Sequence, residues 1–404
     1  MRVDRRRFGR LVGGVVAAGT VAVGEARAQQ DGDGRGDGRR GRGRGGNGDG
    51  DGNGSGDGDG RRRGPGGPGA AATLLALPDD RTPENLAVGP DGDLYVGITA
   101  GEVRRIDRET ALTATDLALD DTDLVATLPA SAGVESTPSG TLYVAVNGED
   151  GAGVWTVPPD GDAASEYVPI PADGGFVNDV AFDPADGRLL VTESFAGVVY
   201  EVPVGPDGAA LETAEASEWV ADGALDTPEF GANGVVRRDD DVVVAVTRAT
   251  DDDGDDVGRL VSVPVAGDGS AGEPSTLIES PAVFGADGIA VGPGPNAAGS
   301  PGDGGGSGGR SGGAVHVAAN ARDEVVVVPP AGDPVVVADA DDGLVFPSDV
   351  AFAGGGRADG AGGGGGAGGG GGAGGANADR GGPLFVCNFA VSSPEDAGVL
   401  RIGR

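Results

Sequence analysis

Residues 83–96 read PENLAVGPDGDLYV, and this stretch decides the fold. An apolar strand over residues 84–88 is followed by the turn Pro90-Asp91-Gly92 and by a second strand over residues 93–96. Proline, aspartate and glycine in a row are typical of a tight turn between two strands. The segment therefore predicts a β-hairpin, and the same order of elements can be sought in the rest of the chain.

The unit recurs five more times towards the C-terminal end. The residues that open the first strands of the six copies are Glu84, Ala132, Asn178, Asn233, Asp287 and Ser348. A third strand follows in every copy, and a fourth apolar stretch separates one copy from the next. The last copy lacks a fourth stretch, but residues 73–77, before the first copy, supply one. A repeat of 40 to 50 residues with four short strands predicts a propeller blade. We therefore predict an all-β fold over residues 71–404, a six-bladed β-propeller of four-stranded blades whose N-terminal strand completes the last blade.

The segments outside the repeat have compositions of their own. Arg5-Arg6-Arg7-Phe8 precedes an apolar stretch and an A-x-A sequence that ends at residue 28, so residues 1–28 resemble a twin-arginine signal. We expect an exported protein, extracellular or cell-surface associated, with no integral membrane span after cleavage; a retained N-terminal anchor is the alternative. Residues 29–70 are rich in Gly, Asp and Arg, which predicts a disordered linker. Gly-rich insertions at 292–313 and 354–382 fall between first and second strands.

The composition excludes several classes of function. The net charge is −35 and every basic residue is arginine, which argues against a nucleic-acid partner and indicates adaptation to high salt. A single cysteine, Cys387, excludes an internal disulfide and cysteine-based metal centres. The single histidine, His316, lies in a predicted second strand where packing explains it. Asp251-Asp252-Asp253 opens an acidic run that lacks the spacing of a calcium loop, so it predicts a solvated turn.

The residues that open the first strands form one column of the repeat. Because the innermost strands line the centre of a propeller, we expect their side chains to form a ring there. Glu84, Asn178, Asn233 and Asp287 offer carboxylate and amide oxygens, which suit Ca²⁺, Mg²⁺ or Mn²⁺. The alternative is that these polar residues cap turns or bind water.

The units Pro83-Glu84-Asn85, Phe176-Val177-Asn178-Asp179, Ala232-Asn233-Gly234 and Asp287-Gly288-Ile289 resemble the SMP-30/gluconolactonase family, also called regucalcin-like. The resemblance covers about residues 73–404. It implies a six-bladed propeller that hydrolyses lactones with one divalent cation, Ca²⁺ first and Mg²⁺, Mn²⁺ or Zn²⁺ as alternatives. It further implies that Glu84, Asn233 and Asp287 bind the cation, that Asn178 contacts substrate or metal, and that Asp287 is the general base.

One position departs from the family. Phe176 stands where animal members carry an arginine that grips the hydroxyl groups of a sugar lactone. An apolar side chain cannot replace the donors of a guanidinium. We therefore expect the substrate to be a less polar lactone or ester. We also expect the protein to be a monomer. The competing hypothesis is a non-catalytic extracellular binding module with a structural cation.

Overall fold

The computed structural model describes residues 71–403, except 149–150, 160, 162, 172–174, 252, 295–312 and 354–381. The predicted signal, the predicted linker and nearly all of both Gly-rich insertions lie outside the described residues. The flanks of the insertions are described: one connects β18 to β19, and the other connects β22 to β23.

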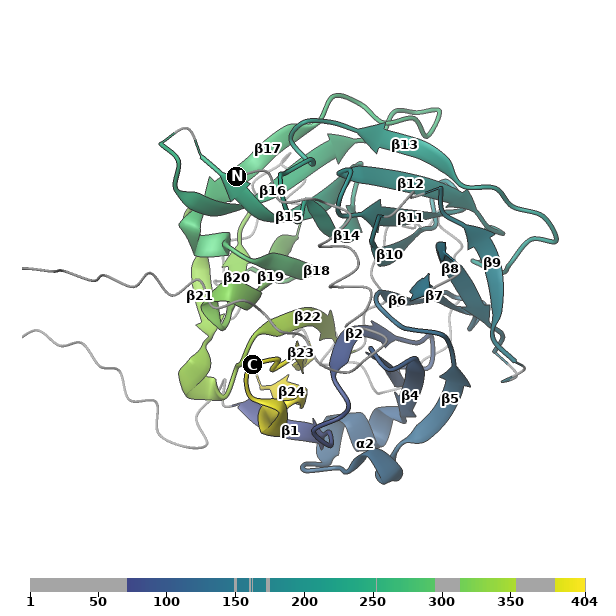
Figure 1. Cartoon of the computed structure of the whole chain (residues 1–404), viewed down its shortest axis with the longest axis vertical. Coiled ribbons are helices and arrows are strands. Elements are labelled where there is room, and N and C mark those ends of the chain that lie inside the picture. The colour runs from purple at the N-terminus through teal and green to yellow at the C-terminus, as the bar shows by residue number, and fades with distance from the viewer. Residues whose placement is uncertain are drawn as a thin grey trace, which may run out of the picture.

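The described residues form six four-stranded antiparallel sheets arranged in a ring, which confirms the predicted six-bladed propeller (Figure 1). The first three blades contain β2 (Pro83–Val88), β3 (Leu94–Ile98), β4 (Glu102–Ile106), β5 (Asp123–Thr127); β6 (Val134–Ser136), β7 (Leu142–Gly148), β8 (Gly151–Val157), β9 (Ser165–Pro169); and β10 (Val177–Asp183), β11 (Arg188–Glu193), β12 (Val198–Pro203), β13 (Ser217–Ala221). The last three contain β14 (Ala232–Arg238), β15 (Asp241–Thr250), β16 (Asp256–Pro264), β17 (Ser275–Ser280); β18 (Ala286–Gly292), β19 (Ala314–Ala319), β20 (Glu324–Val328), β21 (Val335–Ala338); and β22 (Pro347–Phe352), β23 (Leu384–Asn388), β24 (Gly398–Ile402), β1 (Ala71–Ala76).

Helical structure within the described residues is short and lies between strands. It comprises α2 (Arg108–Thr113) and the 3₁₀ helices η1 (Leu119–Asp121), η2 (Pro281–Val283), η3 (Asn320–Arg322), η4 (Ala340–Asp342) and η5 (Pro394–Asp396).

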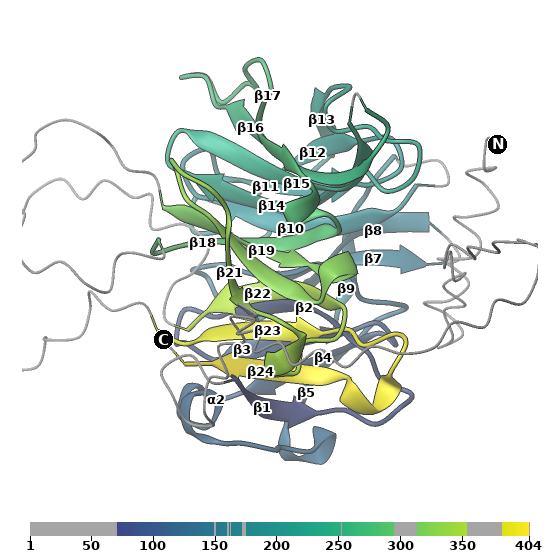
Figure 2. The same ribbon diagram turned by 90° about the vertical axis from the view of Figure 1, so that its left-hand side faces the viewer.

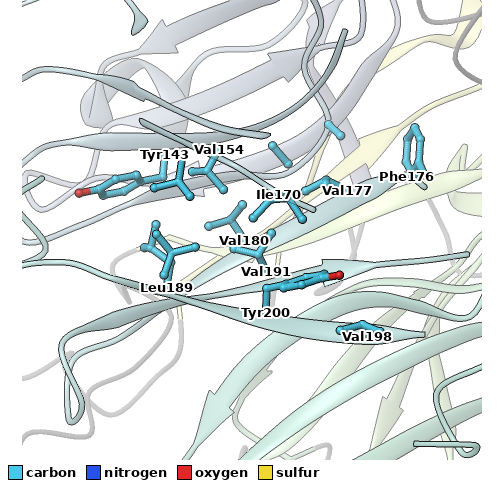
Figure 3. Packing of buried hydrophobic residues seen from close by; sticks show 14 of the residues in the cluster. Tyr143, Val154, Ile170, Phe176, Val177, Val180, Leu189, Val191, Val198 and Tyr200 are labelled. Atoms are coloured by element: carbon cyan, nitrogen blue, oxygen red, sulfur yellow. The ribbon is translucent and has the colours of Figure 1, made fainter. Parts of the chain in front are cut away.

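The core lies between the blades, because each sheet packs against a neighbour on both of its faces. Strands β10 and β11 are buried along their whole length, whereas the outer strand β17 is mostly exposed. Figure 3 shows one inter-blade cluster, in which Tyr143 and Val154 of the second blade face Val180, Leu189 and Tyr200 of the third. Valine predominates because its branched side chain suits a pleated surface.

The two ends of the described chain meet in the sixth blade. Strand β1 pairs antiparallel with β24, with Ala71 opposite Ile402. The two strands lie side by side in Figures 1 and 2, where the first is purple and the second yellow. Leu74 and Leu75 of β1 are fully buried. The prediction that an N-terminal strand completes the last blade is therefore confirmed.

A buried arginine joins the third blade to the fourth at the end of the hairpin that connects β10 and β11. The guanidinium of Arg188 donates to Asp183 Oδ2 from Nε and Nη2, both at 3.2 Å. Its Nη1 donates to Glu201 Oε2 and to the carbonyl of Gly269 in the fourth blade, both at 2.7 Å. The group also lies 5.0 Å from the ring centre of Trp219. Asp183 is fully buried, and Arg237 Nε lies 3.8 Å from its other oxygen, so two arginines face this carboxylate.

We expect Arg188→Met to lower the free energy of unfolding by about 3–5 kcal/mol, because the buried Asp183 carboxylate loses a charged partner. Chemical denaturation measures the loss. Arg105→Met is the matched control, since Arg105 and its partner Asp123 are largely exposed; that change should cost no more than about 1 kcal/mol. Equal effects of the two substitutions would contradict the prediction.

Candidate functional site

A β-bulge marks the column residue in five of the six innermost strands. The pairing of each strand with its neighbour skips at this position in β2, β10, β14, β18 and β22. A bulge leaves a residue out of the ladder and turns its side chain away from the regular alternation. Each skip contains a column residue: Glu84, Asn178, Asn233, Asp287 or Ser348. Ala132 precedes β6 and brings no polar side chain.

Asp287 lies at the centre of a hydrogen-bonded group. Its side chain is only 8% exposed, and Asn320 Nδ2 donates to its Oδ2 at 2.8 Å. Burial raises the pKa of Asp287 to about 8; the negative charges of Asp349 and Asp179 act in the same direction, while hydrogen bonds from Asn320 and Asn233 oppose the shift. The structure thus brings Asp287 and Asn233 into direct contact.

Glu84 faces the same group of acids from the first blade. Burial raises the pKa of Glu84 well above its ordinary value, and the nearby charges of Asp287, Asp349 and Asp179 raise it further. Part of the side chain remains accessible at the propeller axis. Glu84 and Asp287, 203 positions apart in the sequence, therefore repel each other when both are ionised.

Hydroxyl groups fix the orientation of the two column asparagines. Asn178 Nδ2 donates to Ser194 Oγ at 3.0 Å, and Asn233 Nδ2 donates to Thr247 Oγ1 at 2.9 Å. Ser194 Oγ in turn donates to the carbonyl of Ala232, beside Asn233. In both asparagines the hydroxyl group holds Nδ2, so Oδ1 lies on the other side of the amide group and is not used in these two bonds.

The next residue along the innermost strands ties the blades to one another. Asn85 Oδ1 accepts from the backbone N–H of Val134 at 2.9 Å. Asp179 Oδ2 accepts from Val235, and Asp349 Oδ2 accepts from Leu86. These contacts give Asn85, Asp179 and Asp349 a structural role, and the two buried carboxylates add negative charge beside Asp287.

The donor set suits a hard divalent cation. The set consists of the carboxylates of Glu84 and Asp287 and the amide oxygens of Asn233 and Asn178. Carboxylate and amide oxygens are the ligands that Ca²⁺ and Mg²⁺ prefer. Burial raises the pKa of both acids and nearby carboxylates raise it further, and a bound cation would favour their ionised forms. In the part of the chain that the structure describes, no three or more His, Cys, Asp or Glu side chains are grouped so that they could hold a metal ion. The candidate centre therefore depends on the two amides as well as the two acids.

The other candidate nucleophiles and ligands are packed inside the protein. His316 of β19 is fully buried, with Nε2 3.1 Å from the carbonyl of Pro293 and its ring edge-on to Phe352. Cys387 of β23 is fully buried, and burial raises the pKa of its thiol well above the ordinary value. Asp251 accepts hydrogen bonds from the backbone of Asp253 and Asp255, as a turn requires. His316 thus has the packing role and Asp251 the turn role that the sequence predicts, and Cys387 is a side chain of the core.

The comparisons with known proteins agree on the fold. Residues 70–106, which include β1 and the first three strands of the first blade, match the family described as strictosidine synthase-like, N-terminal. No curated protein matches the chain. Among solved structures, the chain is similar to an auxiliary nutrient binding protein from Bacteroides thetaiotaomicron, at 10% identity and a TM-score of 0.54, with 82% of this chain and 76% of that chain covered.

Two further solved structures are similar to this chain. An auxiliary nutrient binding protein from Bacteroides ovatus has 11% identity and a TM-score of 0.52, with 83% of this chain and 72% of that chain covered. A calcium-binding protein, regucalcin, from Agrobacterium tumefaciens has 14% identity and a TM-score of 0.49, with 83% and 94% covered.

Among the described residues, no helix has the length and hydrophobicity that a bilayer crossing would need.

Proposed function

We propose that this protein is a metal-dependent hydrolase of a lactone or related ester. One divalent cation would be held by Glu84, Asn233 and Asp287, with Asn178 binding substrate or metal. The observation that carries the proposal is the Asp287 carboxylate, which is buried, turned out of its strand by a bulge and held by Asn320 and Asn233. The resemblance of the repeat units to SMP-30/gluconolactonase proteins supports the same assignment.

A cation held by Glu84, Asn233 and Asp287 would supply Lewis acidity to the carbonyl group of the ester. Asn320 donates to Oδ2 of Asp287 and orients the carboxylate, which would accept a proton from water. The hydroxide that results adds to the carbonyl carbon, the acyl C–O bond breaks, and the proton passes from Asp287 to the departing alkoxide oxygen. The product is a hydroxy acid, or an acid and an alcohol if the substrate is an open ester.

The setting of the reaction is part of the proposal. We propose that the Arg5-Arg6-Arg7-Phe8 signal exports the protein to the cell surface or beyond, where it works as a monomer in high salt. The excess of acidic residues and the absence of lysine support the salt adaptation. Ca²⁺ is the first candidate cation, since the donor set consists of oxygen atoms throughout.

A non-catalytic binding module is the second candidate. Phe176 and Ala132 offer no donor to a polar substrate beside the column, which favours this alternative. In such a module the same cation would stabilise the fold and would take no part in a reaction.

Turnover of a lactone and ester panel after chelation tests the proposal. We expect hydrolysis in high salt to require added Ca²⁺, Mg²⁺, Mn²⁺ or Zn²⁺. The same cation should raise the melting temperature, because it binds the folded state alone. Glu84→Gln should lose this rise, and Glu109→Gln, on the exposed side of α2, should keep it. Folded protein that binds the cation but hydrolyses nothing would contradict the hydrolase and leave the binding module.

A further inference from the structure

Three phenylalanines from three separate loops contact one another at the rim of the third and fourth blades. Phe176 precedes β10, Phe195 follows β11, and Phe230 precedes β14. Their ring centres are 6.2 Å apart for Phe176 and Phe195, 5.8 Å for Phe176 and Phe230, and 5.1 Å for Phe195 and Phe230. The first two rings are more than nine-tenths buried, whereas Phe230 is half-buried. We call these three residues the phenylalanine cluster.

The phenylalanine cluster lies at the same end of the propeller as the candidate site. It stands where the innermost strands begin and the second strands end, and the column residues occupy the same end of those strands. Ser194 joins the two directly: its backbone N–H donates to the carbonyl of Phe176, and its Oγ holds the amide of Asn178. The carbonyl of Ser194 accepts from Gly231, next to Phe230. Figure 3 shows Phe176 at one edge of the inter-blade core, far from Tyr143.

A buried carboxylate fixes the backbone that carries two of the rings. Glu193 is 1% exposed, and its Oε1 accepts from the N–H groups of Phe176 at 2.7 Å and Phe195 at 3.0 Å. Its Oε2 accepts from Ala196 at 2.6 Å. A carboxylate can be buried only when such hydrogen bonds satisfy it. The rings are thus held in place by the backbone as well as by packing.

The composition of the chain makes the cluster unusual. Aromatic residues form 4% of the sequence, and the inter-blade core is otherwise built mainly from valine, leucine and alanine. Aromatic rings are large apolar surfaces that stack with other rings at centre distances of 4.5 to 7 Å. Phe230 is only half-buried, so the phenylalanine cluster reaches the surface on that side, where one more apolar group can pack against it.

We propose that the phenylalanine cluster is a specificity subsite that binds an apolar group of phenyl size on the lactone or ester. This inference rests on the proposed function, since the reacting carbonyl is placed at Asp287. Asn178 is linked to the phenylalanine cluster through Ser194, which contacts both its amide and the backbone of Phe176. The apolar substituent of the substrate would thus lie against the phenylalanine cluster, while the reacting carbonyl group lies at Asp287.

Two lactones that differ in one substituent test the subsite. γ-Phenyl-γ-butyrolactone and γ-methyl-γ-butyrolactone both open to a secondary alcohol, so their ratio of kcat/KM reports the substituent. We expect the wild-type protein to favour the phenyl compound by about tenfold or more. Phe230→Ala should lower this ratio by at least about threefold, and Phe230→Leu should lower it less, because leucine keeps an apolar side chain in place.

Phe389→Ala is the matched control. Phe389 is also a half-buried phenylalanine, packed against Phe346 with ring centres 6.0 Å apart, but it follows β23 of the sixth blade. The ratio should stay at its wild-type value in this variant. A wild-type ratio near one, or equal losses in Phe230→Ala and Phe389→Ala, would overturn the subsite while the hydrolase stands.

Binding of the two hydroxy acid products separates this inference from the proposed function. If neither lactone is hydrolysed, titration calorimetry in Ca²⁺ still compares the phenyl acid with the methyl acid. Tighter binding of the phenyl acid that Phe230→Ala abolishes would support the subsite although the hydrolase had failed. Equal binding of the two acids would overturn it.

Discussion

Asp287→Asn is expected to reduce kcat/KM for the best lactone by about 10²–10⁴-fold, the range over which a general base contributes. An amide cannot accept the proton of the attacking water, although its oxygen can still accept the hydrogen bond from Asn320. We also expect the free energy of unfolding without cation to stay the same or rise. The reason is that the ionised Asp287 carboxylate is repelled by Glu84 and Asp349.

Asp179→Asn provides the matched control for this variant. Asp179 is equally buried at the axis, but its two oxygens accept from the backbone of Val180 and Val235. Loss of a charge-assisted bond should cost about 1.5–3 kcal/mol of stability. Kinetics and chemical denaturation of both variants should therefore separate catalysis from folding. Full turnover in Asp287→Asn would contradict the assigned general base.

Removal of β1 is expected to leave the propeller unable to fold. A chain that starts at residue 78 lacks the ladder with β24 and the fully buried side chains of Leu74 and Leu75. Deletion of one buried leucine side chain costs about 2–5 kcal/mol, and whole domains are stable by only about 5–15 kcal/mol. The unpaired edge of β24 would also favour aggregation. Denaturant titration and light scattering measure both effects.

A chain that starts at residue 71 is the control, because it differs from the shortened chain only by residues 71–77. It should unfold at the same denaturant concentration as the full chain. A synthetic peptide of residues 71–77 should restore part of the lost stability by pairing with β24. A shortened chain that unfolds like the control would show that ring closure matters little.

The fold follows from the sequence where a local turn signal coincides with apolar periodicity. Pro90-Asp91-Gly92 lies between β2 and β3, and Gly92 has the positive φ of 87° for which glycine is suited. In the second blade the innermost strand β6 is only three residues long. The two residues before it, Ala132 and Gly133, are held by backbone hydrogen bonds to Ala145 without forming a longer strand.

The candidate site was predicted less completely, because much of it depends on contacts across blades. The column could be aligned from the repeat, but a bulge is a property of strand register and shows only in the paired sheet. Asn320 follows the second strand of its blade at the repeat position that Ser194 and Thr247 occupy in theirs, and each of the three bonds the column residue of its own blade. The residue type differs among the three, so the shared role appears only in the paired sheets. Asp179 and Asp349 directly follow column residues, and their bonds to the next blade form only when the blades pack. Phe195 and Phe230 come from different blades, and their contact arises only when those blades pack.

The pairing of Ala71 with Ile402 also determines when this protein can finish folding. Five blades draw their strands from one continuous stretch of chain, whereas the sixth takes β1 from one end of the described region and the rest from the other. A nascent chain on the ribosome can therefore assemble blades in order of synthesis, but the ring stays open until residue 402 has emerged. Contacts so distant in sequence also slow folding, since a long loop must close before they form. Resistance to proteolysis should appear abruptly, once β24 has emerged and paired with β1.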